Sequence, residues 1–181
     1  METYIALLFS IGIGGGRRLK MADWRAMLEE IGMQNSRTLI TTGNAVFGCH
    51  TSDVRALELK LEDAFERRFG RRVDTIVHPA EFYRRLIVDN PFSREATRDG
   101  ERVLVRVMRE PLKNGMLAGL SPHRTQGERV KIVHGNAWVH FKHAPNGSRL
   151  LRALASKRLG VGTVRNWNTV RRLGEILGTG E

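Results

Sequence analysis

Apolar residues recur along the chain in two rhythms: continuous or alternating runs typical of strands, and spacings of three and four typical of helices. In the first half, a strand run precedes a helical pattern that ends at Gly32, and two strands flank a tight turn at Gly43-Asn44. A longer helical pattern ends at Gly70, and a short last helix ends at Asn90-Pro91-Phe92. The predicted order is β-α-β-β-α-β-α, over residues 3–11, 21–31, 36–41, 45–49, 54–69, 72–78 and 79–89.

The polar segment 93–100 carries no apolar periodicity and predicts a linker. The same order of elements then returns, with a tight turn at Gly135-Asn136 and a helix that ends at Gly160. Strands are expected at 102–108, 128–134, 137–142 and 161–165, and helices at 112–120, 148–158 and 169–177.

Three pairs of matching residues indicate that the two halves are duplicates. Their sequence offsets are nearly equal at 92, 93 and 90: Gly43-Asn44-Ala45 with Gly135-Asn136-Ala137, Leu19-Lys20 with Leu112-Lys113, and Phe69-Gly70 with Leu159-Gly160. We therefore predict an α+β protein of two tandem ferredoxin-like β-α-β-β-α-β units, each an antiparallel sheet with helices on one face. The first unit, with an extra helix, is expected over 1–92, and the second, with a final helix, over 101–181.

Several short segments occur in an order that resembles a known family. They are Tyr4-Ile5-Ala6-Leu7-Leu8, the glycine-rich segment before Met21, Thr42-Gly43-Asn44-Ala45-Val46-Phe47, Asn90-Pro91-Phe92 and Arg165-Asn166-Trp167-Asn168-Thr169. Together they resemble the bacterial domain-of-unknown-function 1697 family over nearly the whole chain. The resemblance implies the duplicated fold and a bacterial cytoplasmic protein, and it brings no established activity.

The chain departs from the family pattern in its first loop. Phe9, Ser10 and Gly12 stand where the family has Arg, Gly and Asn, and Thr42 replaces the usual Ser. If the family's Arg and Asn serve a common function, this member has lost or altered it.

Composition adds a strong positive charge to an otherwise ordinary globular chain. Lys and Arg exceed Asp and Glu by 30 to 19, which gives a net charge of +11, and arginines outnumber lysines 24 to 6. This charge favours a polyanion partner such as nucleic acid or a phosphorylated small molecule, although codon bias in a GC-rich genome would produce an arginine-rich surface equally well. The single cysteine, Cys49, excludes an intramolecular disulfide and favours the cytoplasm. No signal peptide and no membrane segment is expected.

Topology predicts that three basic or glycine-rich segments meet at one end of the first unit. They are Gly14, Gly15, Gly16, Arg17 and Arg18 after the first strand, Asn44 in the hairpin turn, and Arg71 and Arg72 after the second helix. A glycine loop ahead of a helix turns backbone N–H groups toward an anion, and arginines add paired donors. We therefore predict a phosphate-binding end, with a plain glycine turn and solvated arginines as the alternative. The loop matches neither a Walker loop nor G-x-G-x-x-G, so no cofactor is expected.

A second candidate lies at the opposite end, where Arg165, Asn166, Trp167 and Asn168 open the last helix. This segment is expected near His143, Asn146 and Ser148, where a polar cleft is possible. The alternative is structural, with Asn166 or Asn168 capping the helix and Trp167 anchoring it in the core.

Residues 134–141 partly match the third-strand motif of RNA-recognition domains, in which Trp138 would stack on a base. The alternative packs Trp138 beneath a helix. His134, His140 and His143 lack neighbouring Cys or carboxylate ligands, so no metal site is expected. Acidic residues of the second helix, Glu58 and Glu62 among them, are expected on solvated faces, and no pair forms a catalytic dyad.

These observations favour a cytoplasmic protein that binds nucleic acid or another phosphate-bearing ligand without catalysis. Two alternatives remain open: an enzyme acting on a phosphorylated small molecule, and an interaction module that dimerises without a ligand.

Overall fold

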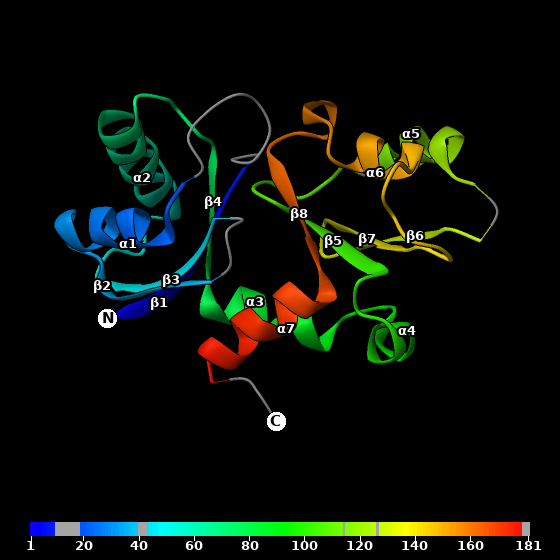
Figure 1. Cartoon of the computed structure of the whole chain (residues 1–181), viewed down its shortest axis with the longest axis horizontal. Helices are drawn as coiled ribbons and strands as arrows, with labels where there is room; N and C mark the ends of the chain where they lie inside the picture. Colours follow the sequence, from blue (N-terminus) through cyan, green and yellow to red (C-terminus); the bar gives the residue numbers. More distant parts are fainter. Residues whose placement is uncertain (10–18, 40–42, 114, 126, 179–181) are drawn as a thin grey trace. The chain divides into compact units, whose positions relative to one another are not determined.

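A computed structural model describes residues 1–9, 19–39, 43–113, 115–125 and 127–178, and the chain divides into two compact units. The first comprises Met1–Arg85 and Leu173–Glu181, and the second comprises Leu86–Arg172. Each holds a four-stranded antiparallel sheet, in the order β2-β3-β1-β4 in one unit and β6-β7-β5-β8 in the other (Figure 1). The equivalent strands follow the same order in both sheets, which confirms the predicted pair of ferredoxin-like units.

The first half of the chain contains every element that its apolar pattern predicts. They are β1 (Glu2–Leu8), α1 (Met21–Glu30), β2 (Gln34–Leu39), β3 (Asn44–Cys49), α2 (Val54–Phe69), β4 (Thr75–Pro79) and α3 (Ala80–Val88). The boundaries of α2 follow from local chemistry. The Asp53 carboxylate accepts a hydrogen bond of 2.9 Å from the Ala56 N–H, and Gly70 ends the helix with a φ of 71°.

Alternate residues of the first sheet build a core under α1 and α2 (Figure 1). Tyr4, Ala6 and Leu8 of β1 share this face with Phe47, and Trp24 of α1 packs against it. Two carboxylates of α2 contradict the expectation of a solvated face, because Glu58 and Glu62 are only 2% and 3% exposed. Their oxygens accept hydrogen bonds from the N–H groups of Val77, at 3.1 Å, and Thr75, at 3.0 Å. These carboxylates thereby satisfy the edge of β4 that does not pair with β1.

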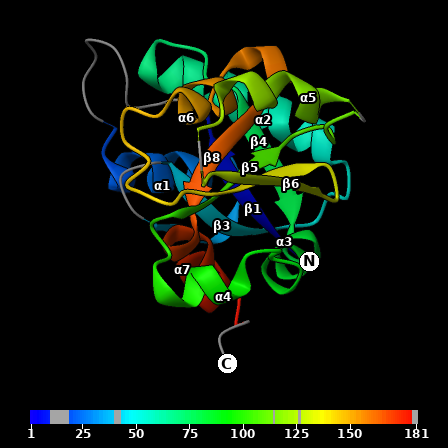
Figure 2. The same cartoon turned by 90° about the vertical axis from the view of Figure 1, so that its right-hand side faces the viewer.

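After one additional helix, the second half repeats this order, and the helices between its strands are shorter (Figure 2). Its elements are α4 (Ser93–Arg98), β5 (Val103–Met108), α5 (Met116–Leu120), β6 (Arg129–Val133), β7 (Asn136–His140), α6 (Arg149–Leu154), β8 (Gly162–Asn166) and α7 (Trp167–Ile176), with short 3-10 turns η1 (Ser121–His123) and η2 (Lys157–Leu159). The helix expected over 148–158 ends at Leu154, since Ser156 starts the η2 turn by accepting a hydrogen bond of 3.2 Å from the Arg158 N–H.

Most of the segment 93–100, which the sequence predicts as a linker, forms the helix α4. Only Ala96 of this helix is buried, so the segment offers no apolar periodicity from which a helix could be predicted. The two units divide elsewhere, between Arg85 and Leu86 inside α3 and between Arg172 and Leu173 inside α7.

The matched residues of the two halves occupy equivalent positions. Gly43 and Gly135 have φ angles of 74° and 73°, in the left-handed region that a tight hairpin turn requires. Asn44 and Asn136, which follow them, begin β3 and β7 and are fully buried. Among the described residues, no helix has the length and apolar character needed to cross a bilayer.

Candidate functional site

Segment ends of the first unit meet as the predicted topology requires. The Leu8 N–H donates a hydrogen bond of 2.8 Å to the Gly43 carbonyl, and the Phe9 N–H donates one of 2.9 Å to the Asp74 carbonyl. The end of β1 therefore lies between the hairpin turn and the segment that precedes β4. The predicted anion ligands Gly14, Gly15, Gly16, Arg17 and Arg18 lie outside the described residues, so anion binding by this loop stays a prediction.

The remaining members of that predicted site are engaged in other contacts. The Asn44 side chain is buried, and its amide donates a hydrogen bond of 3.0 Å to the Leu39 carbonyl within the hairpin. The Arg72 guanidinium binds the α2 carboxylates of Glu62, Asp63 and Glu66 at 2.8–3.1 Å, and their hydrogen bonds raise its pKa. Arg71 is half-buried beside it. Arg72 is thus paired with three carboxylates of its own unit, and its expected role as an anion ligand stays a prediction.

The segment that opens α7 caps this helix, as the structural interpretation of the sequence predicts. The Asn166 side-chain oxygen accepts hydrogen bonds from the N–H and the hydroxyl of Thr169, at 2.9 and 2.8 Å, and so caps the helix. The buried Arg165 guanidinium donates a hydrogen bond of 2.6 Å to the Thr163 hydroxyl. The backbone N–H of Trp167 donates one of 3.1 Å to the Gly100 carbonyl. Asn168 lies beside Gly100, close enough that a side chain at that glycine would clash with it.

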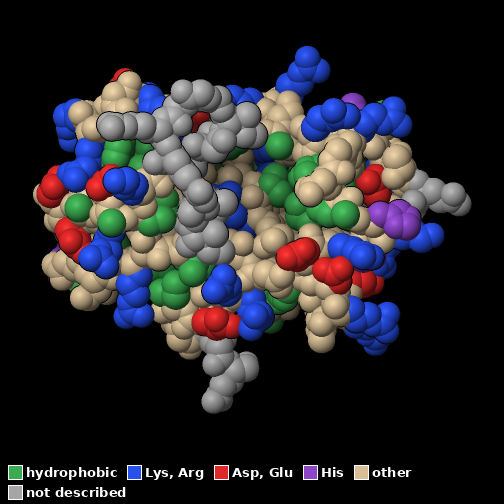
Figure 3. Space-filling model, in the orientation of Figure 1, with side chains coloured by type: hydrophobic (Ala, Val, Ile, Leu, Met, Phe, Trp, Pro, Cys, Tyr) green, Lys and Arg blue, Asp and Glu red, His purple; other side chains and the backbone are tan. Residues whose placement is uncertain are grey.

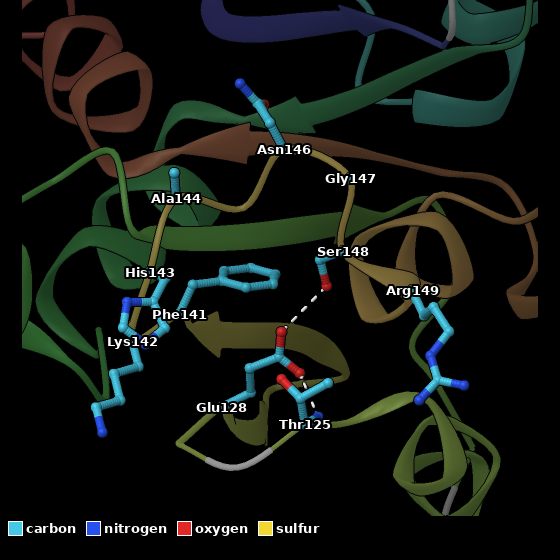
Figure 4. A pocket seen from close by; sticks show the side chains of 10 residues that line it. All are labelled: Thr125, Glu128, Phe141, Lys142, His143, Ala144, Asn146, Gly147, Ser148 and Arg149. Atoms are coloured by element: carbon cyan, nitrogen blue, oxygen red, sulfur yellow. Dashed lines mark hydrogen bonds between the residues drawn. The ribbon is translucent and has the colours of Figure 1, made fainter.

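A polar cleft of about 380 Å³ is present in the second unit, lined by the three predicted residues His143, Asn146 and Ser148 (Figure 4). The segment 165–168, which joins the end of β8 to the start of α7, is not among its lining residues. Glu128, which is 7% exposed, spans the cleft: one carboxylate oxygen accepts a hydrogen bond from the Ser148 hydroxyl at 3.1 Å and the other accepts one from the Thr125 N–H at 2.7 Å.

Glu128 and Ser148 of this cleft form hydrogen bonds within the fold. The Ser148 oxygen also accepts hydrogen bonds from the N–H groups of Leu150 and Leu151 and so caps α6. Glu128 connects this cap to the loop at Thr125, because each of its carboxylate oxygens accepts one of the two hydrogen bonds. The pair therefore positions the start of α6, and Figure 4 shows Arg149 extending from that start, away from Glu128.

Trp138 is fully buried and its ring lies 6.2 Å from that of Trp167. A buried ring has no face open to a base, so the stacking role expected from the RNA-recognition motif is wrong, and Trp138 is a core residue. The three histidines are also dispersed: His134 contacts Asp89 at 2.8 Å, His140 contacts Arg129 at 3.2 Å, and His143 lines the cleft. Within the described residues, no cluster of three or more His, Cys, Asp or Glu side chains is arranged to hold a metal.

A larger hollow of about 600 Å³ lies between α5, α6 and η2, and we call it the arginine pocket. Its basic lining residues are Arg149 and Arg152 of α6, Arg158 of η2 and His123 at the end of η1. Its apolar lining residues are Met116, Leu120, Ala153 and Leu159, which belong to or pack against the core of the second unit. All of these residues belong to the second unit.

The arginines of this pocket differ from Arg72 because no carboxylate in the described part of the chain pairs with them. No Asp or Glu is among the described lining residues, and no ion pair joins Arg149, Arg152 or Arg158 to another residue in the described part of the chain. Figure 3 shows Lys and Arg side chains gathered over α5, α6 and the turn after α6. A lining that combines three arginines with apolar residues is suited to an anion attached to an apolar body.

Sequence reasoning missed this pocket, although one signal was present. Arg149 and Arg152 are three residues apart in a predicted helix and therefore share a face, and Arg158 follows at its end. Their neighbours across the pocket come from α5, about 30 residues earlier in the chain, and only the tertiary structure brings the two helices together.

Comparisons with known proteins agree with the fold and leave the activity open. A family model described as "Protein of unknown function (DUF1697)" matches residues 1–138. A solved structure, that of the conserved bacterial protein SP0830 from Streptococcus pneumoniae, is similar with a TM-score of 0.77 and 21% sequence identity. The similarity covers 98% of this chain and 99% of that one. No curated protein matches the chain.

Proposed function

The chain belongs to the DUF1697 family of proteins of unknown function, and from that premise we propose that it binds a phosphate-bearing ligand in the arginine pocket without catalysing a reaction. One observation carries the proposal: Arg149, Arg152 and Arg158 line one pocket that no described carboxylate neutralises. A guanidinium binds phosphate oxygens through paired, charge-assisted hydrogen bonds, each contributing roughly 1.5–3 kcal/mol. The net charge of +11 adds long-range attraction for any such ligand, nucleic acid included.

The absence of a proton-transfer pair in the lining favours binding over catalysis. His123 is the imidazole among the described lining residues, and no described lining carboxylate is present to orient it. Ser156 is the lining residue with a hydroxyl group, and its oxygen accepts the hydrogen bond from the Arg158 N–H that forms the η2 turn. We place this function in the cytoplasm, because the chain carries only one cysteine and no disulfide can form within it.

The proposal is tested by titrating the protein with a panel of phosphorylated metabolites and with a mixed-sequence oligonucleotide, each at several salt concentrations. We expect the double variant Arg152→Ala/Arg158→Ala to weaken binding by about tenfold or more, which corresponds to about 1.4 kcal/mol. The matched control is Arg25→Ala/Arg94→Ala, which removes the same charge from exposed positions outside the pocket. If wild type binds no phosphorylated probe, or if both double variants bind like wild type, the proposal is wrong.

The same titrations separate the two candidate anion sites. If the glycine segment is the site, Arg17→Ala/Arg18→Ala weakens oligonucleotide binding and flattens its salt dependence, while the pocket variant leaves both unchanged. Release of a chemical product from a bound metabolite would favour the alternative of an enzyme. A ligand-independent dimer, seen by light scattering together with no binding, would favour the interaction module.

A further inference from the structure

We propose that the arginine pocket takes a mononucleotide-sized ligand whose phosphate meets the arginines and whose planar base covers apolar lining residues next to Gly119. This inference rests on the proposed function and narrows its ligand class. The lining of the pocket is chemically mixed, because it combines Arg152 and Arg158 with Met116, Leu120 and Leu159. A bare phosphate would leave these apolar residues in contact with water, whereas a base would cover part of them.

Gly119 lines the pocket from within α5, a position where glycine is unfavourable for a helix. Its backbone does not lie in the left-handed region, so its conformation does not require glycine. A Cβ built there meets no described atom within 4 Å, so the open space beside Gly119 is not filled by another side chain. The missing side chain thus leaves room for a ring against the backbone of α5.

The hollow follows from a difference between the two duplicated units. In the first unit, α1 and α2 have 10 and 16 residues, and Trp24, Met27 and Leu28 of α1 are buried in the core. The equivalent helices of the second unit, α5 and α6, have 5 and 6 residues, and Leu120 is the buried residue of α5. The shorter helices also bury fewer residues, one in α5 and two in α6 against three in α1 and six in α2.

The size and lining of the pocket favour a small ligand over a nucleic-acid strand. A volume of about 600 Å³ falls within the usual range of small-molecule sites, roughly 300–1,000 Å³. Proteins that bind single strands present a long basic groove with aromatic side chains on which successive bases stack. His123 is the aromatic ring among the described lining residues, and Trp138 is buried elsewhere in the unit.

The test compares adenosine 5′-monophosphate, ribose 5-phosphate, inorganic phosphate and a single-stranded oligonucleotide by isothermal titration. We expect the mononucleotide to bind about tenfold or more tightly than ribose 5-phosphate, because only its base covers the apolar lining residues. Gly119→Leu fills the space beside α5 and should remove that preference while leaving ribose 5-phosphate affinity unchanged. Ala118→Leu is the control: it adds the same bulk at an exposed position of α5 outside the pocket lining, and it should retain the mononucleotide preference.

Two results would overturn the narrower inference while leaving the proposed function intact. One is equal, Arg152-dependent affinity for the mononucleotide and ribose 5-phosphate, and the other is Arg152-dependent binding of the oligonucleotide alone. A preference that survives Gly119→Leu in a folded protein would also contradict it, since the base would then lie elsewhere. If no probe depends on Arg152 or Arg158, the proposed function itself fails.

Discussion

The Arg106 guanidinium donates a hydrogen bond of 2.7 Å to the backbone carbonyl of Gly160, the residue that follows the η2 turn. A second nitrogen of the same group donates to the carbonyl of Leu154 at the end of α6. Arg106 lies on the central strand β5 and is fully buried, and burial lowers its pKa to about 10. One buried cation on the sheet thus fixes both ends of the turn that carries Arg158.

We expect Arg106→Met to destabilise the second unit, although methionine fills much of the same space. Losing the guanidinium leaves two carbonyls without donors, at about 1–3 kcal/mol each, partly offset because the buried charge is also removed. Urea unfolding should therefore show that the free energy of unfolding falls by about 1–3 kcal/mol. Arg106→Lys, which keeps the charge but has no planar fork to reach both carbonyls, should recover only part of it. An Arg106→Met protein as stable as wild type would show that these carbonyls do not depend on the guanidinium.

Asn166→Ala should lower the free energy of unfolding by about 1 kcal/mol, because it removes the hydrogen bond that caps α7 at the Thr169 N–H. Asn166→Asp keeps a capping oxygen and should restore most of the stability. Chemical denaturation measures both. If Asn166→Ala is as stable as wild type but binds phosphorylated probes less well, the residue belongs to a ligand site instead of a cap.

Trp138→Ala should lower the free energy of unfolding by about 3–5 kcal/mol, because it leaves a cavity in the core of the second unit. Trp138→Phe keeps most of the ring volume and should lose less. Single-stranded RNA should leave the fluorescence of Trp138 unquenched, since no face of its ring is exposed. A folded Trp138→Phe protein that loses RNA binding and RNA-dependent quenching would restore the stacking hypothesis.

The ion pair of Glu95 with Arg129 predicts a pH-dependent contribution to stability. The hydrogen bond from Arg129 lowers the pKa of Glu95 below its ordinary value, so the unfolded chain takes up this proton at a higher pH than the folded chain. The stability advantage of wild type over Glu95→Gln should be fully present above the ordinary pKa of glutamate. It should disappear as the pH falls through the lower pKa of the folded state, as measured by urea unfolding across an acid pH series.

A second, higher pH window serves as the control for that series. Burial lowers the pKa of His140, so the unfolded state gains this proton first as the pH falls below about 6.5. Wild type and Glu95→Gln should both lose stability there. A wild-type advantage over Glu95→Gln that stays constant down to pH 2 would contradict the role of the ion pair.

Local patterns along the chain were sufficient to predict the duplicated fold. Spacings of three and four mark α1 and α2, and Gly43 and Gly135 mark equivalent hairpin turns because each needs a positive φ. The α4 helix escaped prediction because it buries only Ala96. Each correct prediction concerns residues close together in the chain, where backbone preference and side-chain periodicity act directly.

The roles of individual charged and aromatic residues depended on contacts that no local pattern contains. In the sequence, Glu62 and Arg72 resemble solvated charges of a helix and a loop. In the fold, Glu62 accepts a hydrogen bond from the Thr75 N–H, and Arg72 forms ion pairs with carboxylates of α2. Trp138 fits a stacking motif but is enclosed by its own unit. Arg152 and Gly119 form one pocket only because α5 and α6 lie side by side. The chain itself determined the elements and their order, whereas burial and charge compensation, which arise between distant segments, decided which side chains remain available to a ligand.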